Sequence, residues 1–224
     1  MLSRERINEH LRLQDQLNQL IHPNWVEQQF NWTRAAMVES IELLDHIGWK
    51  WWKDQKIDLE QTHLELVDIW HFILSNELAA CRGDHTAAAN NLIRLLMDDP
   101  SSTVYTGLAG VINLRTLETR DLVHVFAGMT AFGYMPLAAF DLLMNKVGLR
   151  WYELHRMYLA KNVLNIFRQK HGYKTGEYAK VWGKYGEDNK ILAELINLEP
   201  DATAEQLMAE LDSLYTEVIE SAQA

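Results

Sequence analysis

The sequence predicts an all-α protein, built as a bundle of antiparallel helices. Three observations support this fold class. Apolar residues recur at the three- and four-residue spacing of amphipathic helices along most of the chain. The 224 residues include only four prolines and 11 glycines, so residues that end helices are few. We find no convincing alternation of apolar and polar residues, which is the pattern of a half-buried strand.

The first part of the chain is expected to form three long helices. Apolar residues from Ile7 to Ile21 define one face of a first helix, which ends before Pro23. A second helix is predicted from about Asn31 to His46, and a third from about Leu59 to Ala80. The connection, residues 47–58, is short enough for the third helix to return antiparallel to the second.

The second part is expected to contain shorter helices, one long helix and a functional loop. The segment HGYKTGEYAKVWGKYGEDNK contains several glycines and little apolar periodicity, so we interpret it as an ordered loop that ends where Glu187 begins another helix. The motif TAEQ at 203–206 resembles a capping box that opens a terminal helix. The other helices are predicted at Ala87 to Met97, Val104 to Leu114, Arg120 to Thr130, Pro136 to Val147 and Trp151 to Lys170.

Residues 1–224 are predicted to form one domain, because the sequence contains no internal repeat, low-complexity tract or flexible linker. A composition that is 48% apolar and 23% charged can bury a sizeable core. The formal net charge of −10 gives no general attraction for a nucleic-acid backbone. We therefore expect no nucleic-acid partner, whereas a small phosphorylated ligand is compatible with this charge.

The sequence also predicts a cytoplasmic protein with no membrane partner. The N-terminus MLSRERINEH lacks the apolar core of a signal peptide, and no apolar run approaches the roughly 18 residues of a membrane span. The single cysteine, Cys81, cannot form a disulfide within the chain and lies in an apolar helical pattern. A buried, unreactive thiol in a reducing compartment is the interpretation we favour.

Two pairs of acids are the clearest candidates for chemistry. Glu39 and Glu42 lie in the stretch ESIELLDHIGWKWWK, and Glu65 and Asp68 lie in ELVDIWHF. Residues three apart project from the same side of a helix, so each pair can point at one spot. The second pair also interrupts the apolar face of its helix. Because the two helices should be antiparallel neighbours, we expect the two pairs to meet.

Four converging carboxylates indicate a metal site. An acid on an apolar face has to be paired, protonated or bound to a cation, because an isolated buried charge is very unfavourable. Hard oxygen ligands, with no cysteine or histidine set arranged beside them, favour Mg²⁺, or Mn²⁺ as a substitute, over a structural zinc ion. Mg²⁺ commonly bridges carboxylates and substrate phosphates.

Two other interpretations of these acids remain open. They can be solvated surface groups in ordinary helix salt bridges, since one spaced pair of acids is a weak signal. Asp68 and His71 also match the acid-x-x-His pattern of di-iron bundles, although that pattern needs two helices and only one is clear here. We interpret His71 as a core residue or one that supports a ligand.

An aromatic and basic run follows the first acid pair. GWKWWK places Trp49, Trp51 and Trp52 beside Lys50 and Lys53. The tryptophans can simply close one end of the bundle, with the lysines in solvent. Alternatively, an indole face can lie beside a nucleobase and an ammonium group beside a phosphate.

A second basic segment lies near the end of the chain. Seven Lys and Arg residues against three acids give residues 161–190 a local charge of +4. With glycines and free backbone N–H groups, such a loop can hold a di- or triphosphate, although a run of charges is more often a solvated surface. The chain contains neither a Walker-type nor a G-x-G-x-x-G pattern, so a nucleotide would be held in another way.

These motifs together resemble a known family. ESIELLDHIGWKWWK, ELVDIWHF, the early LQDQLN and the late KNVLNIFRQKHGYKTGEYAKVW with EDN are similar to the dimeric dUTPases of the all-α NTP pyrophosphohydrolase superfamily, which includes MazG-like enzymes. The superfamily pattern E-x-x-E followed by E-x-x-D is permissive, whereas the tryptophan-lysine run and the GYK loop are more specific. The resemblance covers residues 13–68 and 161–189. Between Arg82 and Arg150 we match no motif.

The resemblance implies a fold, a reaction and site residues. It implies a helical bundle of this superfamily that hydrolyses dUTP, and also dUDP, to dUMP as a Mg²⁺-dependent homodimer. Glu42 is the candidate to orient or deprotonate the attacking water. The implied metal ligands are Glu39, Glu42, Glu65 and Asp68. The implied substrate ligands are Gln14 and Asn18 at uracil, Trp52 at the base and sugar, and Lys161, Asn165, Arg168, Tyr173, Lys180 and Asn189 at the sugar and phosphates.

Two alternatives to a dUTPase are kept. A pyrophosphohydrolase of the same fold can act on another nucleotide, such as dCTP or a modified nucleotide. A helical nucleotide-binding protein can retain the acids without turnover. Paired amides favour uracil, because an amide offers the donor and the acceptor that the edge of uracil requires.

Overall fold

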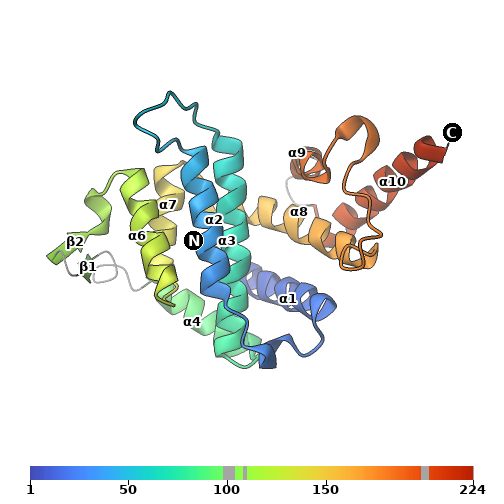
Figure 1. Ribbon diagram of the computed structural model, residues 1–224. Helices are drawn as coiled ribbons and strands as arrows, with labels where there is room; N and C mark the ends of the chain where they lie inside the picture. Colours follow the sequence, from blue (N-terminus) through green and yellow to red (C-terminus); the bar gives the residue numbers. More distant parts are fainter. Residues whose placement is uncertain (98–103, 108–109, 198–201, 224) are drawn as a thin grey trace.

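The computed structural model describes residues 1–97, 104–107, 110–197 and 202–223. Helices make up most of it, accompanied by one short β-hairpin and several 3₁₀ turns (Figure 1). The predicted all-α class is confirmed. None of the helices in these ranges is long and apolar enough to cross a membrane.

A pair of antiparallel helices forms the centre of the molecule. Helices α2 (Trp32–His46) and α3 (Leu59–Ala80) lie side by side, as predicted, and the connection between them extends beyond their ends (Figure 1). The side chains of Asn31 and Asp58 cap the two N-termini by accepting bonds from backbone N–H groups. Gly48 follows α2 with φ of 72°, and an added Cβ would lie 3.1 Å from Cβ of Gln55. Glycine is therefore required at this turn.

Two further helices cross this pair. Helix α1 (Arg4–Ile21) packs against α3, α4 (His85–Met97) and α8 (Trp151–Lys170), while α8 also contacts α3. The buried side chains of α1 include Ile7, Leu11, Gln14 and Asn18, spaced three or four residues apart. The last two are polar and lie next to α3 and α8. The 3₁₀ turn η1 (Trp25–Gln28) follows α1 and precedes α2.

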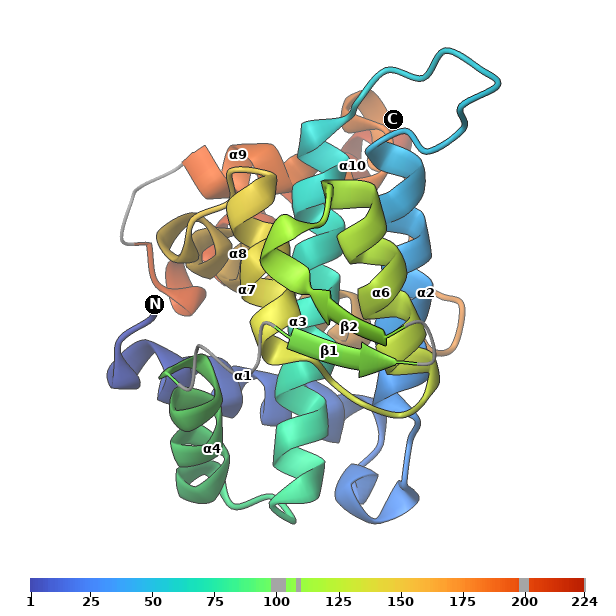
Figure 2. The same ribbon diagram turned by 90° about the vertical axis from the view of Figure 1, so that its left-hand side faces the viewer.

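The prediction of a helix after residue 103 was wrong, because residues 104–107 and 110–113 form strands. The segment Val104 to Leu114 was expected to be helical, but β1 (Val104–Gly107) and β2 (Gly110–Asn113) pair antiparallel, with Val104 opposite Asn113. The hairpin lies at the edge of the molecule, beyond α6 (Thr119–Ala131) and α7 (Leu137–Lys146) (Figure 2). The 3₁₀ turn η2 (Leu114–Thr116) connects it to α6. Helices α6 and α7 match their predicted ranges to within one residue at each end.

The chain after α8 forms a structured loop and two more helices. The loop contains η3 (Gly183–Tyr185) and leads into η4 (Asp188–Ile191) and α9 (Leu192–Asn197), close to the predicted helix start. Helix α10 (Ala204–Gln223) begins with the predicted capping box, in which Thr203 and Gln206 exchange bonds of 2.7 and 3.3 Å. It packs against α8.

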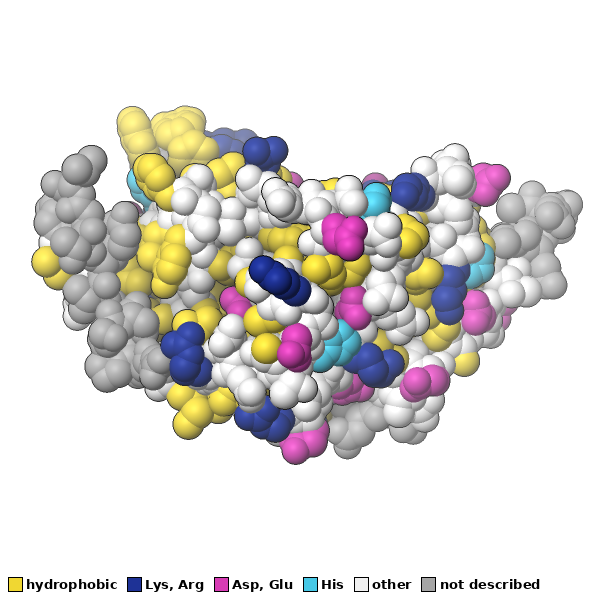
Figure 3. Space-filling model, turned by 90° about the horizontal axis from the view of Figure 1, so that it is seen from below, with side chains coloured by type: hydrophobic (Ala, Val, Ile, Leu, Met, Phe, Trp, Pro, Cys, Tyr) yellow, Lys and Arg dark blue, Asp and Glu magenta, His cyan; other side chains and the backbone are white. Residues whose placement is uncertain are grey.

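Buried apolar residues from α1, α3, α7, α8 and α10 belong to one continuous core. That continuity is what a single domain requires, and the domain assignment stays a prediction. On the face seen from below, acidic and basic side chains of the described residues are interspersed rather than separated by sign (Figure 3).

Candidate active site

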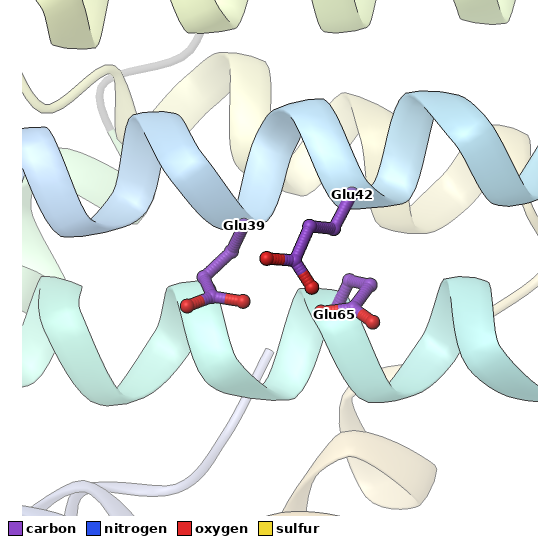
Figure 4. Close-up of side chains that lie close together, drawn as sticks. All are labelled: Glu39, Glu42 and Glu65. Atoms are coloured by element: carbon purple, nitrogen blue, oxygen red, sulfur yellow. The ribbon is translucent and has the colours of Figure 1, made fainter.

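Three glutamates meet between α2 and α3. Glu39 and Glu42 extend from α2 toward Glu65 on α3 (Figure 4), and one oxygen of each lies within 4.8 Å of the others. The short antiparallel connection and the three-residue spacing position these groups, as the sequence predicted. Such a set of oxygens fits a hard divalent cation.

The electrostatics of the cluster also fit a cation. Burial, together with repulsion from Asp68, Glu65 and Glu42, raises the pKa of Glu39 to about 8. Burial and the charges of Asp68 and Glu42 raise the pKa of Glu65 to about 7. Both pKa values lie far above the ordinary 4.5 because burial disfavours the charged carboxylates and the neighbouring acids repel one another. A divalent cation would supply the missing positive charge.

Asp68 lies next to this cluster but pairs with a different group. Its Oδ2 is 3.0 Å from Nζ of Lys161, which extends from α8 and is only 7% exposed. The structure thus brings three of the four predicted ligands together, while the fourth forms an ion pair with a buried lysine. The predicted site residue Lys161 is therefore placed at the edge of the carboxylate cluster.

A pocket of about 420 Å³ adjoins the acids on the other side of Asp68. Helix α1, the segment from η1 to α2, α3 and the end of α8 supply its walls. Most of the lining is apolar or aromatic, as is common for small-molecule sites. The residues that line it are Gln14, Leu17, Asn18, Ile21, Trp25, Phe30, Trp32, Asp68, His71, Phe72, Asn165, Arg168, Gln169 and Tyr173.

Gln14 and Asn18 place two amides in this pocket, as the resemblance implied. They lie one turn apart on α1, and both are buried. Nε2 of Gln14 donates to Oδ1 of Asn18 at 3.1 Å, and Nδ2 of Asn18 donates to Oγ of Ser75 at 3.0 Å. Each amide therefore has a defined orientation before any ligand binds.

His71 adds a third polar group to the pocket. Its Nδ1 lies 2.8 Å from the carbonyl oxygen of Val67, and a carbonyl can only accept, so the proton is on Nδ1. Burial lowers the pKa of His71 to about 4, which leaves the ring neutral at pH 7. Its buried Nε2 has no partner in the described part of the chain and presents a lone pair. The sequence interpretation of His71 as a core or supporting residue missed this position in the pocket wall.

The end of α8 is anchored to the late loop by Arg168. Its Nε and Nη2 donate to the two carboxylate oxygens of Asp188, both at 2.7 Å. It also donates to Oδ1 of Asn165 at 2.9 Å and to Oδ1 of Asn189 at 2.8 Å. Arg168, Asn165 and Asn189 are thus brought together as predicted, but the charge of Arg168 is matched by a buried carboxylate.

Four predicted substrate ligands do not line the pocket: Lys161 and Asn189 pair with residues that line it, whereas Trp52 and Lys180 lie at the surface. Trp52 is 57% exposed on the connection between α2 and α3, where it contacts Trp49 and Trp51. Lys180 is exposed and lies 3.7 Å from Glu187. Neither lines the pocket, and the predicted closure of the tryptophan-lysine run over base and phosphate is absent from this structure.

Other aromatic residues line the pocket in place of Trp52. Trp25 and Phe30 come from the segment before α2, Trp32 is the first residue of α2, and Phe72 comes from α3. The ring of Trp32 lies in edge contact with Trp25 and Phe30 and stacks on Phe72. The signal for them was the aromatic spacing in WVEQQFNW, which the sequence analysis did not use.

Comparison with known protein families gave a match. A model of the protein family described as dUTPase matches residues 6–173. A search of curated proteins found no match. The matched region includes residues 82–150, to which the sequence resemblance assigned nothing, and it ends at Tyr173, before most of the basic loop.

Proposed function

This chain belongs to the dUTPase family, and we propose that it hydrolyses dUTP to dUMP and pyrophosphate with Mg²⁺ held by Glu39, Glu42 and Glu65. The observation that carries the proposal is the convergence of these acids beside a pocket that ends in two oriented amides. The cluster of acids suits a cation bound to phosphate, and the two amides suit the hydrogen-bonding edge of a pyrimidine. Asp68 lies between them and joins the two parts of the site.

Bound Mg²⁺ would neutralise charge on the phosphate oxygens and make a water molecule more acidic. Glu39, Glu42 and Glu65 would hold it, because positive charge relieves the repulsion among them. Asp68 would join them as the fourth ligand if Lys161 moved from it to the substrate. Glu42 is the most exposed of the three clustered acids and can reach solvent. We assign it the role of orienting or deprotonating the attacking water.

Uracil would bind in the aromatic pocket. Trp32 and Phe72 offer apolar ring faces, while Gln14 and Asn18 each offer a donor and an acceptor. His71 presents an acceptor at Nε2, which suits the N3–H of uracil. Cytosine carries a lone pair at N3, so it would leave two acceptors facing each other in a buried site. The pocket is therefore expected to prefer dUTP over dCTP.

The phosphates would extend from the pocket toward the acids. Lys161 is a buried cation paired with Asp68 beside them, and we assign the sugar to Tyr173 and Asn165 in the pocket wall. Arg168 would act through hydrogen bonding more than through net charge, because Asp188 already neutralises it. From the family resemblance we also propose that dUDP is accepted and that the enzyme is a cytoplasmic homodimer.

The test is pyrophosphate release from dUTP, with dUMP identified as the other product, in Mg²⁺ and in EDTA. Turnover is expected only with the metal, and Glu42→Gln should reduce it by at least about 100-fold, as is usual for loss of a general base. Glu60→Gln, at an exposed acid in the first turn of α3, is the matched control. Undiminished turnover in Glu42→Gln would refute the assignment of Glu42.

Base preference is tested separately. Initial rates on dUTP, dCTP, dTTP and UTP should be highest on dUTP. Equal rates on dUTP and dCTP would instead support a pyrophosphohydrolase with another base preference. Binding of dUTP without turnover in either metal condition would support a non-catalytic nucleotide-binding protein.

A further inference from the structure

We infer that two buried hydroxyl groups outside the pocket, those of Tyr158 and Ser75, set the base selectivity of this enzyme by fixing the orientation of Gln14 and Asn18. Neither residue lines the pocket, and both are fully buried, so neither can touch a substrate. They are positioning residues that act through the amides. The inference rests on the proposed role of the pocket in binding uracil.

The four side chains form one continuous chain of hydrogen bonds. The hydroxyl of Tyr158 donates toward Oε1 of Gln14 at 3.3 Å, and Gln14 donates to Asn18 at 3.1 Å. Asn18 then donates to Oγ of Ser75 at 3.0 Å, and that hydroxyl donates to the carbonyl oxygen of His71 at 2.9 Å. Every bond runs in the same direction, from α8 through α1 into α3.

The two ends of the chain are themselves constrained. Nδ2 of Asn162 donates to the hydroxyl of Tyr158 at 3.3 Å, so the Tyr158 proton is directed toward α1. There its single proton is shared between two acceptors on α1, Oε1 of Gln14 at 3.3 Å and the carbonyl oxygen of His10 at 2.9 Å. At the other end, the main-chain acceptor of His71 takes the Ser75 proton. Ser75 can therefore only accept from Asn18.

This direction matters because a side-chain amide has nearly the same shape at both ends. Rotation by 180° exchanges its donor and its acceptor. In the observed orientation each amide has one N–H and one lone pair left for a ligand. A rotated Asn18 would place Oδ1 against Oγ of Ser75, and two buried acceptors would face each other. Rotation of Gln14 would do the same at Asn18, so the two amides keep their orientation together.

Uracil and cytosine differ by an exchange of hydrogen-bond donors and acceptors, and so do the two orientations of a side-chain amide. Their edges have similar shapes, but donor and acceptor are exchanged at N3 and at the 4-position. A site whose amides can rotate would accommodate both bases, whereas a site with fixed amides favours one. The hydroxyls of Tyr158 and Ser75 thus supply discrimination without contacting the base.

The experiment compares kcat/KM for dUTP and for dCTP in wild type, Tyr158→Phe and Ser75→Ala. Each variant is expected to lower the dUTP-to-dCTP ratio by about five- to tenfold, the effect of one neutral hydrogen bond. A purely structural role would lower both rates by the same factor and leave the ratio unchanged. Ser75→Thr, which keeps the hydroxyl, should retain the wild-type ratio.

Thr130→Val is the matched control. Its hydroxyl is equally buried but donates to the main-chain oxygens of Phe126 and Ala127, within α6. This variant should lose some thermal stability and keep its selectivity ratio. The double variant Tyr158→Phe/Ser75→Ala should resemble the more affected single variant, because the chain acts as a unit.

The outcomes separate this inference from the proposed function. A wild-type enzyme without preference for dUTP would refute the proposed function. A selective wild type whose folded variants keep the same ratio would refute the inference alone. Should neither variant fold, ¹⁵N-labelled wild-type protein decides the question. The side-chain amides of Gln14 and Asn18 should each keep a protected proton before ligand is added, and free exchange of all four protons would overturn the inference.

Discussion

Glu39 and Glu65 hold protons at neutral pH because of their surroundings. Their carboxyl groups share a hydrogen bond with each other and face further acids, so ionisation of both is opposed. In an unfolded chain the same groups would titrate near the ordinary value of 4.5. Between pH 4.5 and pH 8, Glu39 and Glu65 without metal therefore hold more protons in the folded protein than in the unfolded chain.

This difference predicts how stability depends on pH. Where the folded state holds more protons, stability falls as pH rises. His71 and the buried His10, whose lowered pKa values have the opposite effect, contribute mainly below about pH 6.5, the ordinary value for histidine. In EDTA the melting temperature should thus fall from pH 6.5 to pH 8. Saturating Mg²⁺ should remove this slope, whereas Glu39→Gln should only reduce it, because burial and Asp68 still raise the pKa of Glu65. A flat profile in EDTA would contradict the assigned pKa values.

Asp188 gives a second prediction at the scale of single residues. It is fully buried and accepts from Arg168 and from the hydroxyl of Tyr178. Asp188→Ala would leave a buried guanidinium group unpaired, at a cost of roughly 3–5 kcal/mol of unfolding free energy. Urea unfolding measures this loss. Glu187→Ala, at the exposed neighbour, should cost less than about 1 kcal/mol, and equal losses would refute the role of the buried pair.

The closeness of the acids was predicted because a local pattern specified it, while their roles stay predictions. The acids were found because their three-residue spacing and apolar surroundings are visible in the sequence. Asp188 was missed as a partner of Arg168 because the two meet only through the fold of the late loop. Trp52 was assigned by resemblance, but in this structure it lies in solvent while Trp25 and Trp32 line the pocket.

At the scale of elements, helix ends were predicted where capping residues and glycines specify them. Helix α3 has the predicted bounds, and α2 starts one residue after its cap, Asn31. The hairpin at 104–113 was not predicted, because Val104, Val111 and Ile112 also fit a helical apolar spacing. Strand pairing depends on residues opposite each other, and such a short pattern cannot distinguish it from a helix.

The turn after α8 gives a prediction for an element. Gly172 has φ of 83°, and an added Cβ would lie 2.9 Å from Cβ of Glu177, an atom that cannot swing away as the end of the side chain can. Gly172→Ala should destabilise the protein by about 2 kcal/mol or more, since positive φ and a close contact both oppose alanine. It should also raise KM for dUTP, because Tyr173 follows directly in the pocket wall.

Gly176 is the control for this change. It has φ of 79°, but an added Cβ would have no neighbour within 4 Å. Gly176→Ala should therefore cost only about 1 kcal/mol, the strain of positive φ alone. Thermal unfolding of both variants, with KM measured on the same preparations, checks the prediction. If both variants lose the same stability, the contact with Glu177 is unimportant.

At the scale of the whole molecule, residues 6–173, which match the family, pack against later residues that lie outside the match. The match ends at Tyr173, yet Tyr215 of α10 lies against Phe167 of α8 and Trp182 of the loop. Leu211 of α10 is fully buried in the same core. The late loop is thus held between α8 and α10, and its anchors to Arg168 reach the pocket.

Leu211→Ala should consequently reduce both stability and substrate binding. The cavity would cost about 2–5 kcal/mol of unfolding free energy. Loosening of α10 should also raise KM for dUTP more than it changes kcat, because the carboxylates are on α2 and α3. Glu217→Ala, at an exposed position on α10, should change neither. An unchanged KM in a destabilised Leu211→Ala protein would show that the pocket is independent of α10.

The protonated glutamates have one more consequence, which concerns heat. Uptake of a divalent cation at pH 7 must expel protons from Glu39 and Glu65 into the solution. Calorimetric titrations with Mg²⁺ will therefore contain the ionisation enthalpy of whichever buffer receives those protons. The same binding reaction should give different apparent enthalpies in phosphate and in Tris. The slope of apparent enthalpy against buffer ionisation enthalpy counts the protons that each bound ion replaces.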